Sequence, residues 1–149
     1  MNAPASWVHV VDDDRAVRDS LRWLLEGEGL HVRTWESAEA FLAAYSDETA
    51  ACAVVDIRMP GMSGLDLQEA LLRRNAGLPL VFVTAHGEGH LAVTAMRRGA
   101  IDFVEKPFDD EQLVEAVRRA LAFRGRLASL EAAPSLLQAR AAGLSRRER

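Results

Sequence analysis

Acidic residues follow two apolar runs of this sequence. Asp12 and Asp13 come directly after residues 7–11, and Asp56 closes the run that begins at residue 53, shortly before a Pro-Gly break. Continuous apolar runs of this kind are typical of strands buried on both faces, as in a parallel sheet. An Asp at the end of such a strand either begins a turn or belongs to a site, because open α/β sheets bind ligands at the carboxyl ends of their strands. The segment around Asp56 alone leaves both interpretations open.

Two further polar groups follow later apolar runs. Thr84 comes after residues 78–83, and Lys106 follows residues 101–104. In a parallel sheet these strand ends share one edge, where three carboxylates repel each other and cannot all stay ionised without a cation. Ligands that are all oxygens favour a hard ion such as Mg²⁺. Together with an ammonium and a hydroxyl group, the ion would form a receptor for a phosphoryl group, with Asp56 as the nucleophile.

Each of these residues also has an ordinary structural explanation. Asp12 and Asp13 suit a solvated loop, Thr84 suits a helix cap, and Lys106 suits a surface position with a buried stem. A different explanation of this kind would be needed for the polar residue at each of these strand ends. We therefore favour one common site over several unrelated surface residues.

The elements that position these residues alternate along the chain. Apolar runs predict strands at residues 7–11, 30–35, 51–57, 78–83 and 101–104. Apolar residues at helical spacing predict a helix after each strand, with Asp14, Ser37 and Ser63 as caps of the first three. Five strand–helix pairs indicate an α/β fold, with a five-stranded parallel sheet and helices on both faces.

Composition narrows the class of protein. A chain of 149 residues with 49% hydrophobic and 27% charged residues is typical of one globular domain with a short tail. A net charge of −4 argues against a nucleic-acid-binding surface over the whole chain. The single cysteine, Cys52, lies in an apolar run, which indicates a core residue and fits a reducing compartment. Since we find neither a signal peptide nor a membrane-spanning run, we expect a cytoplasmic protein that does not bind membranes.

The segments around these residues resemble the response-regulator receiver domains of bacterial two-component signalling. The matching segments are VVDDD at 10–14, VDIRMPGMSG at 55–64, VTA at 83–85, GA at 99–100 and KPF at 106–108. The resemblance covers about residues 8–121, which is most of the chain. It implies the flavodoxin-like receiver fold, with strand order 2-1-3-4-5.

The resemblance also implies a role for each polar residue. Asp56 would accept a phosphoryl group from a sensor histidine kinase or a small acyl phosphate, and Thr84 and Lys106 would contact that group. Phe103 would be the aromatic switch residue that turns inward when Thr84 moves. The bond between Lys106 and Pro107 is commonly cis in the family. Such a domain modifies itself and slowly loses the phosphoryl group again, so we do not expect an enzyme that acts on other substrates.

A Mg²⁺ ion is the cofactor that the resemblance implies. Asp13 and Asp56 would bind it through their side chains, and Asp12 would bind it through a water molecule. The fourth contribution would come from the backbone carbonyl of Arg58.

Receiver domains often pair when phosphorylated, through the fourth helix, fifth strand and fifth helix. In this sequence the region carries charges of both signs, at Arg97, Arg98, Asp102, Glu105 and Arg118. We expect a phosphorylation-dependent homodimer through this face. The alternative is a solvated polar surface, because exposed ion pairs contribute only about 0–1 kcal/mol each.

The chain divides into four parts by sequence. They are a flexible N-terminus at 1–6, a receiver domain at 7–124, a partly helical linker at 125–143 and the start of a DNA-binding domain at 144–149. The last part, LSRRER, is similar to the beginning of a LuxR-type helix-turn-helix domain. With DIRMP at 56–60 and DFVEKP at 102–107 it indicates the FixJ-type transcription regulators. We expect a truncated chain that would act on DNA only through the missing domain.

Two other functions compete with this interpretation. A stand-alone receiver would bind a protein partner and never DNA. A Mg²⁺-dependent phosphohydrolase would need an acid two residues after its nucleophile, where this chain has Arg58. His86 and His90 have the spacing of a metal pair, but Gly87 and Gly89 make a regular helix between them improbable, so we expect solvent-exposed histidines.

Overall fold

Strands and helices alternate throughout the part of the chain that the structure, a computed structural model, describes. It describes residues 7–46 and 50–132, with side chains as far as residue 123. The strands are β1 (Trp7–Val11), β2 (Val32–Trp35), β3 (Ala50–Asp56), β4 (Leu80–Thr84) and β5 (Asp102–Glu105). The helices are α1 (Arg15–Gly27), α2 (Ala38–Ala44), α3 (Gly64–Arg73), α4 (Gly89–Arg97) and α5 (Asp110–Ala132).

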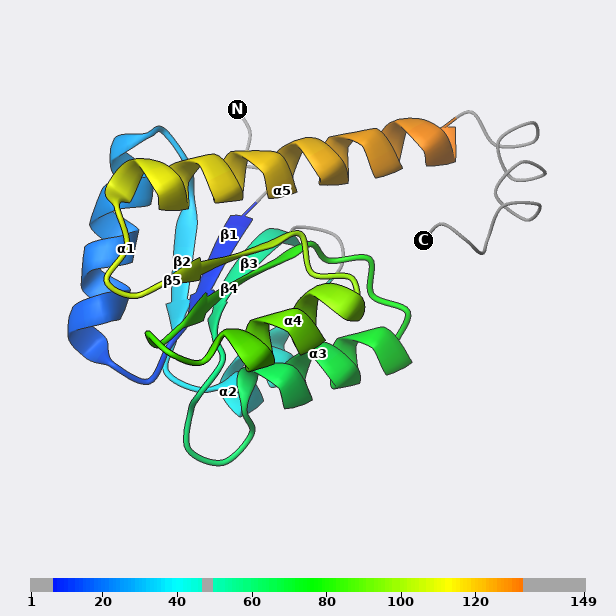
Figure 1. Cartoon of the computed structure of the whole chain (residues 1–149). Coiled ribbons are helices and arrows are strands. Elements are labelled where there is room, and N and C mark those ends of the chain that lie inside the picture. The colour runs from blue at the N-terminus through cyan, green and yellow to red at the C-terminus, as the bar shows by residue number, and fades with distance from the viewer. Residues whose placement is uncertain (1–6, 47–49, 133–149) are drawn as a thin grey trace.

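The five strands form one parallel sheet in the order β2-β1-β3-β4-β5. Helices α1 and α5 cover one face, and α2, α3 and α4 cover the other (Figure 1). The register pairs Val11 with Val55 and Asp56 with Val83, so the ends of β1, β3 and β4 lie side by side. The predicted fold class and strand order are confirmed.

Alternation of side chains along the strands produces two apolar layers. Val10, Val54 and Val81 pack with α1 and α5. Phe82 belongs to the other layer, which also contains Phe41 of α2. Every residue of β3 is buried, as its continuous apolar sequence predicts. Burying each large apolar side chain contributes about 1.5–3 kcal/mol, which makes the central strands a firm base for the residues at their ends.

Some elements begin or end one or two residues away from their predicted positions. Strand β2 begins at Val32 and β4 at Leu80, two residues later than predicted. Pro79 stays outside β4 because it has no N–H to donate, although its carbonyl accepts a hydrogen bond from Ala53. Strand β4 ends on Thr84, which places this residue in register with Glu105 of β5.

The last helix extends beyond residue 124, where the receiver domain was predicted to end. Helix α5 continues through Gly125 to Ala132, and its final turns extend beyond the sheet (Figure 1). Glycine inside a helix costs only about 1 kcal/mol relative to alanine, so one glycine does not end a helix of this length. The predicted N-terminal segment 1–6, the predicted start of a DNA-binding domain at 144–149 and the predicted linker 125–143 from residue 133 onward lie outside the described residues. None of the helices within 7–46 and 50–132 is both long and apolar enough to cross a membrane.

Candidate functional site

The end of β1 holds Asp12 in a buried position. Its side chain is 1% exposed, and Oδ1 accepts a hydrogen bond of 2.9 Å from the backbone N–H of Asp14. Asp14 in turn caps α1 by accepting a bond from the N–H of Ala16. Asp12 Oδ2 is buried and has no hydrogen-bond partner among the described residues. The turn between β1 and α1 therefore leaves one carboxylate oxygen available.

The end of β3 holds the second buried carboxylate, Asp56, which is 8% exposed. Its Oδ1 lies 3.4 Å from the backbone nitrogen of Arg58, which donates to it. The following loop folds back closely, because the N–H of Gly64 donates to the carbonyl of Ile57 at 2.8 Å. A Cβ atom on Gly64 would lie 2.5 Å from the carbonyl oxygen of Asp56. The loop can therefore approach the strand this closely only with glycine at position 64.

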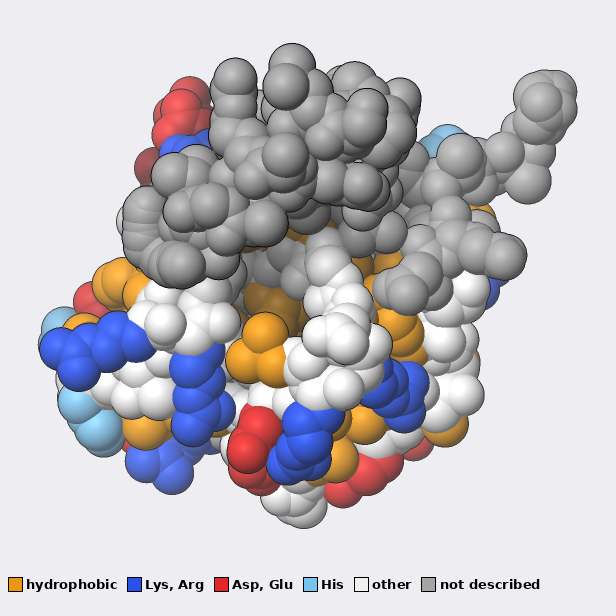
Figure 2. Space-filling view, turned by 90° about the vertical axis from the view of Figure 1, so that its right-hand side faces the viewer, with side chains coloured by type: hydrophobic (Ala, Val, Ile, Leu, Met, Phe, Trp, Pro, Cys, Tyr) orange, Lys and Arg blue, Asp and Glu red, His pale blue; other side chains and the backbone are white. Residues whose placement is uncertain are grey.

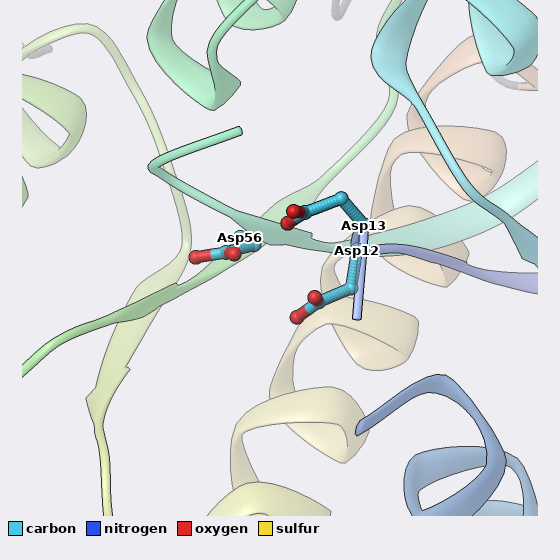
Figure 3. Close-up of side chains that lie close together, drawn as sticks. All are labelled: Asp12, Asp13 and Asp56. Atoms are coloured by element: carbon cyan, nitrogen blue, oxygen red, sulfur yellow. The ribbon is translucent and has the colours of Figure 1, made fainter. Parts of the chain in front are cut away.

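The structure brings four of the predicted site residues together. Asp12, Asp13 and Asp56 each contribute a carboxylate oxygen, and these three oxygens lie within 4.8 Å of one another (Figure 3). Asp13 is exposed, so the cluster opens to solvent on its side. Lys106 Nζ lies 3.8 Å from Asp12 Oδ2 and 4.0 Å from Asp56 Oδ2. Three carboxylates thus face a single ammonium group.

The electrostatics of this cluster favour a bound cation. Burial, with the neighbouring carboxylate of Asp12, raises the pKa of Asp56 to about 6, although Lys106 opposes the shift. Burial also raises the pKa of Asp12. A divalent cation would relieve this repulsion, and a water molecule bound to it could donate to Oδ2 of Asp12, which has no hydrogen-bond partner among the described residues. The residues therefore fit Mg²⁺, which prefers oxygen ligands.

The predicted switch residues lie on neighbouring strands. Thr84 is 1% exposed, and its hydroxyl donates to the carbonyl of Ala85 at 3.0 Å. Phe103 lies in register with Phe82 and is 37% exposed, so its ring faces outward. The bond between Lys106 and Pro107 is cis, as the resemblance implies.

Sequence reasoning missed one ion pair at this edge of the sheet. Arg58 Nε donates to both carboxylate oxygens of Glu88, each at 2.7 Å. This contact raises the pKa of Arg58 above its ordinary value. No motif marks Glu88; the only available signal was that the loops after β3 and β4 begin at neighbouring strand ends.

A second carboxylate holds the loop between β4 and α4 from the other side. Glu105 Oε2 accepts a hydrogen bond of 3.2 Å from the N–H of Gly87 and lies 3.9 Å from Nδ1 of His86. His86 and His90 are both exposed, in agreement with the prediction. In the described part of the chain, neither histidine belongs to a group that could hold a metal ion.

The predicted dimer face needs one correction, at Arg118. This residue lies 2.7 Å from Glu28, which follows α1, and so faces away from α4. The next residue of α5, Arg119, forms the ion pair with Asp102 of β5. Successive residues of a helix point about 100° apart, so a shift of one position changes the face. Charge alone did not distinguish the two arginines.

The other basic residues of the predicted face lie at the end of α4. Arg97 and Arg98 are both exposed, and an Nη of Arg98 also donates to the carbonyl of Leu65. Figure 2 shows several Lys and Arg side chains on the side of the molecule toward which α3 and α4 run. Val93 and Met96 are exposed apolar residues of α4. This helix therefore presents both charged and apolar side chains to solvent.

A parallel five-stranded sheet with an acidic cluster and a lysine at its carboxyl edge defines a class of signalling domain. Residues 8–118 match the response regulator receiver domain family, and the chain belongs to this family. More particularly, it is a receiver domain of the kind found in FixJ-like transcriptional regulators.

Two relatives illustrate this similarity. The chain is 49% identical over 142 residues to the transcriptional regulatory protein FixJ of Azorhizobium caulinodans, which covers 95% of this chain and 67% of the relative. It is 47% identical over 124 residues to the transcriptional regulatory protein TdiR of Thauera aromatica, which covers 83% of this chain and 55% of the relative. The chain thus spans between about half and two thirds of these relatives' lengths.

Solved structures agree with this assignment. The response regulator StyR matches with a TM-score of 0.83 and 40% identity over 96% of this chain and 72% of that one. FixJ-N matches with a TM-score of 0.75 and 42% identity over 82% of this chain and 96% of that one. The predicted family is confirmed, whereas the similarity of residues 144–149 to a LuxR-type domain lies outside the described residues.

Proposed function

We propose that this receiver domain accepts a phosphoryl group on Asp56 from a sensor histidine kinase and thereby controls a C-terminal DNA-binding domain. The observation that carries the proposal is the cluster in which Asp12, Asp13 and Lys106 surround the buried carboxylate of Asp56. A nucleophile that lies beside two acids and an ammonium group, at the edge of the sheet where the strands end, suits phosphoryl transfer.

The proposed reaction joins a carboxylate to phosphorus. An oxygen of Asp56 attacks the phosphorus of a phosphohistidine, the new O–P bond forms as the P–N bond breaks, and the freed imidazole takes up a proton. Later a water molecule attacks the same phosphorus, the O–P bond to Asp56 breaks, and inorganic phosphate leaves. Lys106 is close enough to Asp56 to contact an oxygen of the transferred group. The domain is therefore its own phosphoryl acceptor, and it returns to its original state with only a phosphoryl donor and water consumed.

Mg²⁺ is the cofactor that the acidic cluster suits. Asp13 and Asp56 would hold it through their side chains, Asp12 through a water molecule and Arg58 through its backbone carbonyl. When bound, the ion supplies positive charge that offsets the carboxylates and the oxygens of the entering phosphoryl group. Asp12 keeps its position through the hydrogen bond from Asp14.

The phosphoryl group would act on the rest of the domain through new contacts. The group carries about −1.5 to −2 charge, which replaces the single negative charge of the Asp56 carboxylate beside β4. The Thr84 hydroxyl would leave the carbonyl of Ala85 and donate to a phosphoryl oxygen, and Phe103 would turn inward. We propose that this change alters the face formed by α4 and β5 and favours a homodimer. DNA would be bound only by a domain that lies outside the described residues.

The setting of this reaction follows from the same features. We propose that the domain works in the cytoplasm, where histidine kinases deliver phosphoryl groups. The fully buried thiol of Cys52 suits a reducing compartment.

Treatment with acetyl phosphate and Mg²⁺ tests the proposal. We expect intact mass spectrometry to show the gain of one phosphoryl group by the 149-residue chain and none by an Asp56→Asn variant. Equal gain by the two proteins would overturn the proposal.

A further inference from the structure

The Arg58–Glu88 pair joins the loops that follow two neighbouring strands. Arg58 lies two residues after Asp56 at the end of β3, and Glu88 ends the loop between β4 and α4. Both carboxylate oxygens of Glu88 lie 2.7 Å from Arg58 Nε. The Glu88 side chain is 23% exposed, so the contact is partly shielded from solvent. The pair therefore connects the loop that follows the proposed phosphorylation site to the N-cap residue of α4.

Helix α4 begins without a side-chain cap. Asp14, Ser37 and Ser63 cap α1, α2 and α3 by accepting hydrogen bonds from backbone N–H groups. Glu88 occupies the same position for α4, but it makes no such bond. Its carboxylate is instead committed to Arg58. The start of α4 is thus held by a contact to another loop and not by its own cap.

Arg58 would have a stronger alternative partner after phosphorylation. Its backbone N–H already donates to Asp56 Oδ1, so its side chain starts from a backbone that lies beside the proposed phosphoryl acceptor. A phosphoryl group carries about −1.5 to −2 charge, more than the single charge of Glu88. Arginine also binds phosphate oxygens in a planar, two-pronged manner that suits such an exchange.

We infer that Arg58 and Glu88 form a latch that holds the start of α4 in the unphosphorylated domain. Phosphorylation of Asp56 opens the latch, because Arg58 exchanges Glu88 for the phosphoryl group. This inference rests on the proposed function and adds a second route from Asp56 to α4, beside the one through Thr84 and Phe103.

Hydrogen exchange of the segment 85–93, measured on the full chain with and without acetyl phosphate and Mg²⁺, tests the latch. In the unphosphorylated state we expect Glu88→Gln to speed exchange there roughly two- to fivefold, the scale of a partly exposed ion pair. Phosphorylation should speed exchange by a similar factor in the unsubstituted protein and add little in the variant. Glu69→Gln is the matched control, because Glu69 pairs with Arg73 within α3 and should change nothing.

The double variant Arg58→Glu with Glu88→Arg separates partner exchange from simple loss of charge. We expect the reversed pair to restore slow hydrogen exchange of the segment 85–93. Phosphorylation should leave this exchange slow, because a carboxylate at position 58 does not bind the phosphoryl group. If phosphorylation speeds exchange in the double variant as much as in the unsubstituted protein, the inference is overturned. Unchanged exchange in Glu88→Gln would overturn it as well, even if the double variant does not fold.

Intact mass measured on the same samples separates the two proposals. A phosphoryl gain without faster exchange in the unsubstituted protein refutes the latch alone. Absence of any phosphoryl gain refutes the proposed function and, with it, the opening of the latch.

Discussion

Asp56 combines burial with the nearness of two other acids, and this combination sets the chemistry of the site. Burial, together with the neighbouring carboxylates, raises the pKa values of Asp12 and Asp56. A domain without metal therefore carries unfavourable charge at this edge of the sheet. Cation binding should stabilise the fold.

We predict that Mg²⁺ raises the midpoint of thermal unfolding. At a concentration of about 100 times its dissociation constant, mass action contributes about 2.7 kcal/mol. Asp13→Asn removes a predicted ligand and should abolish most of the rise. Asp14→Asn is the control, since asparagine caps a helix as well as aspartate does and position 14 lies outside the cluster. An equal response to Mg²⁺ in both variants, measured by calorimetry, would contradict the assignment of Asp13.

A second prediction concerns the protonation of His9 and its effect on the stability of the domain. The side chain is 6% exposed, and its Nδ1 accepts a hydrogen bond of 2.9 Å from Trp35 Nε1. Burial, with the charge of Arg33, lowers the pKa of His9 from 6.5 to about 4. Between pH 6.5 and 4 the unfolded chain therefore binds a proton at this residue that the folded chain does not bind. Stability contributed by neutral His9 is complete above pH 6.5 and is lost as pH falls to 4, by about 3 kcal/mol.

Urea denaturation of the unsubstituted protein and of His9→Phe checks this prediction. Phenylalanine keeps a ring that packs against Phe41 but does not titrate. The difference in unfolding free energy between the two proteins should change with pH in this window. His31→Gln, at an exposed histidine, should leave the pH dependence unchanged. A constant difference between pH 7 and pH 4.5 would show that His9 titrates normally in the folded state.

Most residues of the site were predictable because strand ends are readable in the sequence. Continuous apolar runs located Asp12, Asp13 and Asp56, and the parallel topology implied that they converge. The orientation of side chains on helices and loops was not readable. For that reason Glu88 was missed and Arg118 was assigned to the wrong face.

At the scale of elements, the loop after β3 depends on a close approach to the strand. A Cβ atom on Gly64 would lie 2.5 Å from the backbone oxygen of Asp56 and 2.8 Å from Cα of Ile57. Backbone atoms in this position cannot move aside without shifting Asp56, the proposed phosphoryl acceptor. The glycine is therefore required by space at the site.

We predict that Gly64→Ala destabilises the domain by about 1–3 kcal/mol, the usual cost of overpacking. Urea denaturation measures the change. Gly27→Ala is the matched control: it also lies in a helix, but its added methyl group would meet no atom within 4 Å. If Gly64→Ala lowers the free energy of unfolding no more than Gly27→Ala does, the loop can accommodate a methyl group at position 64 and the prediction is wrong.

The elements themselves were predicted more reliably than their ends. Apolar periodicity located all five strand–helix pairs because burial determines it. The ends depend on individual hydrogen bonds, such as the one that Pro79 cannot donate and that would be needed to extend β4. The length of α5 was not predictable from Gly125, because one glycine inside a helix costs only about 1 kcal/mol relative to alanine.

At the scale of the whole molecule, the charged and apolar side chains of α4 suggest a surface for self-association. Arg97 is exposed at the end of α4, and Val93 and Met96 lie exposed on the same helix. The Arg119–Asp102 ion pair ties α5 to β5 beside it. These features support a dimer through α4 and β5 when Asp56 is phosphorylated.

We predict that light scattering reports a doubled mass after treatment with acetyl phosphate and Mg²⁺. Arg97→Glu should weaken the dimer by reversing a charge at its face. Arg15→Glu, on α1 on the opposite face of the sheet, is the control and should leave dimerisation intact. A monomer mass in the phosphorylated unsubstituted protein would rule out this face as a dimer interface.

Peptide mapping tests most directly whether Asp56 carries the phosphoryl group. The chain is treated with acetyl phosphate and Mg²⁺, digested under acidic conditions that preserve acyl phosphates, and analysed by fragment mass spectrometry. We predict one phosphoryl group, on the fragment and at the position of Asp56. A phosphoryl group on Asp12, on Asp13 or on any other residue, with Asp56 unmodified, would contradict the account.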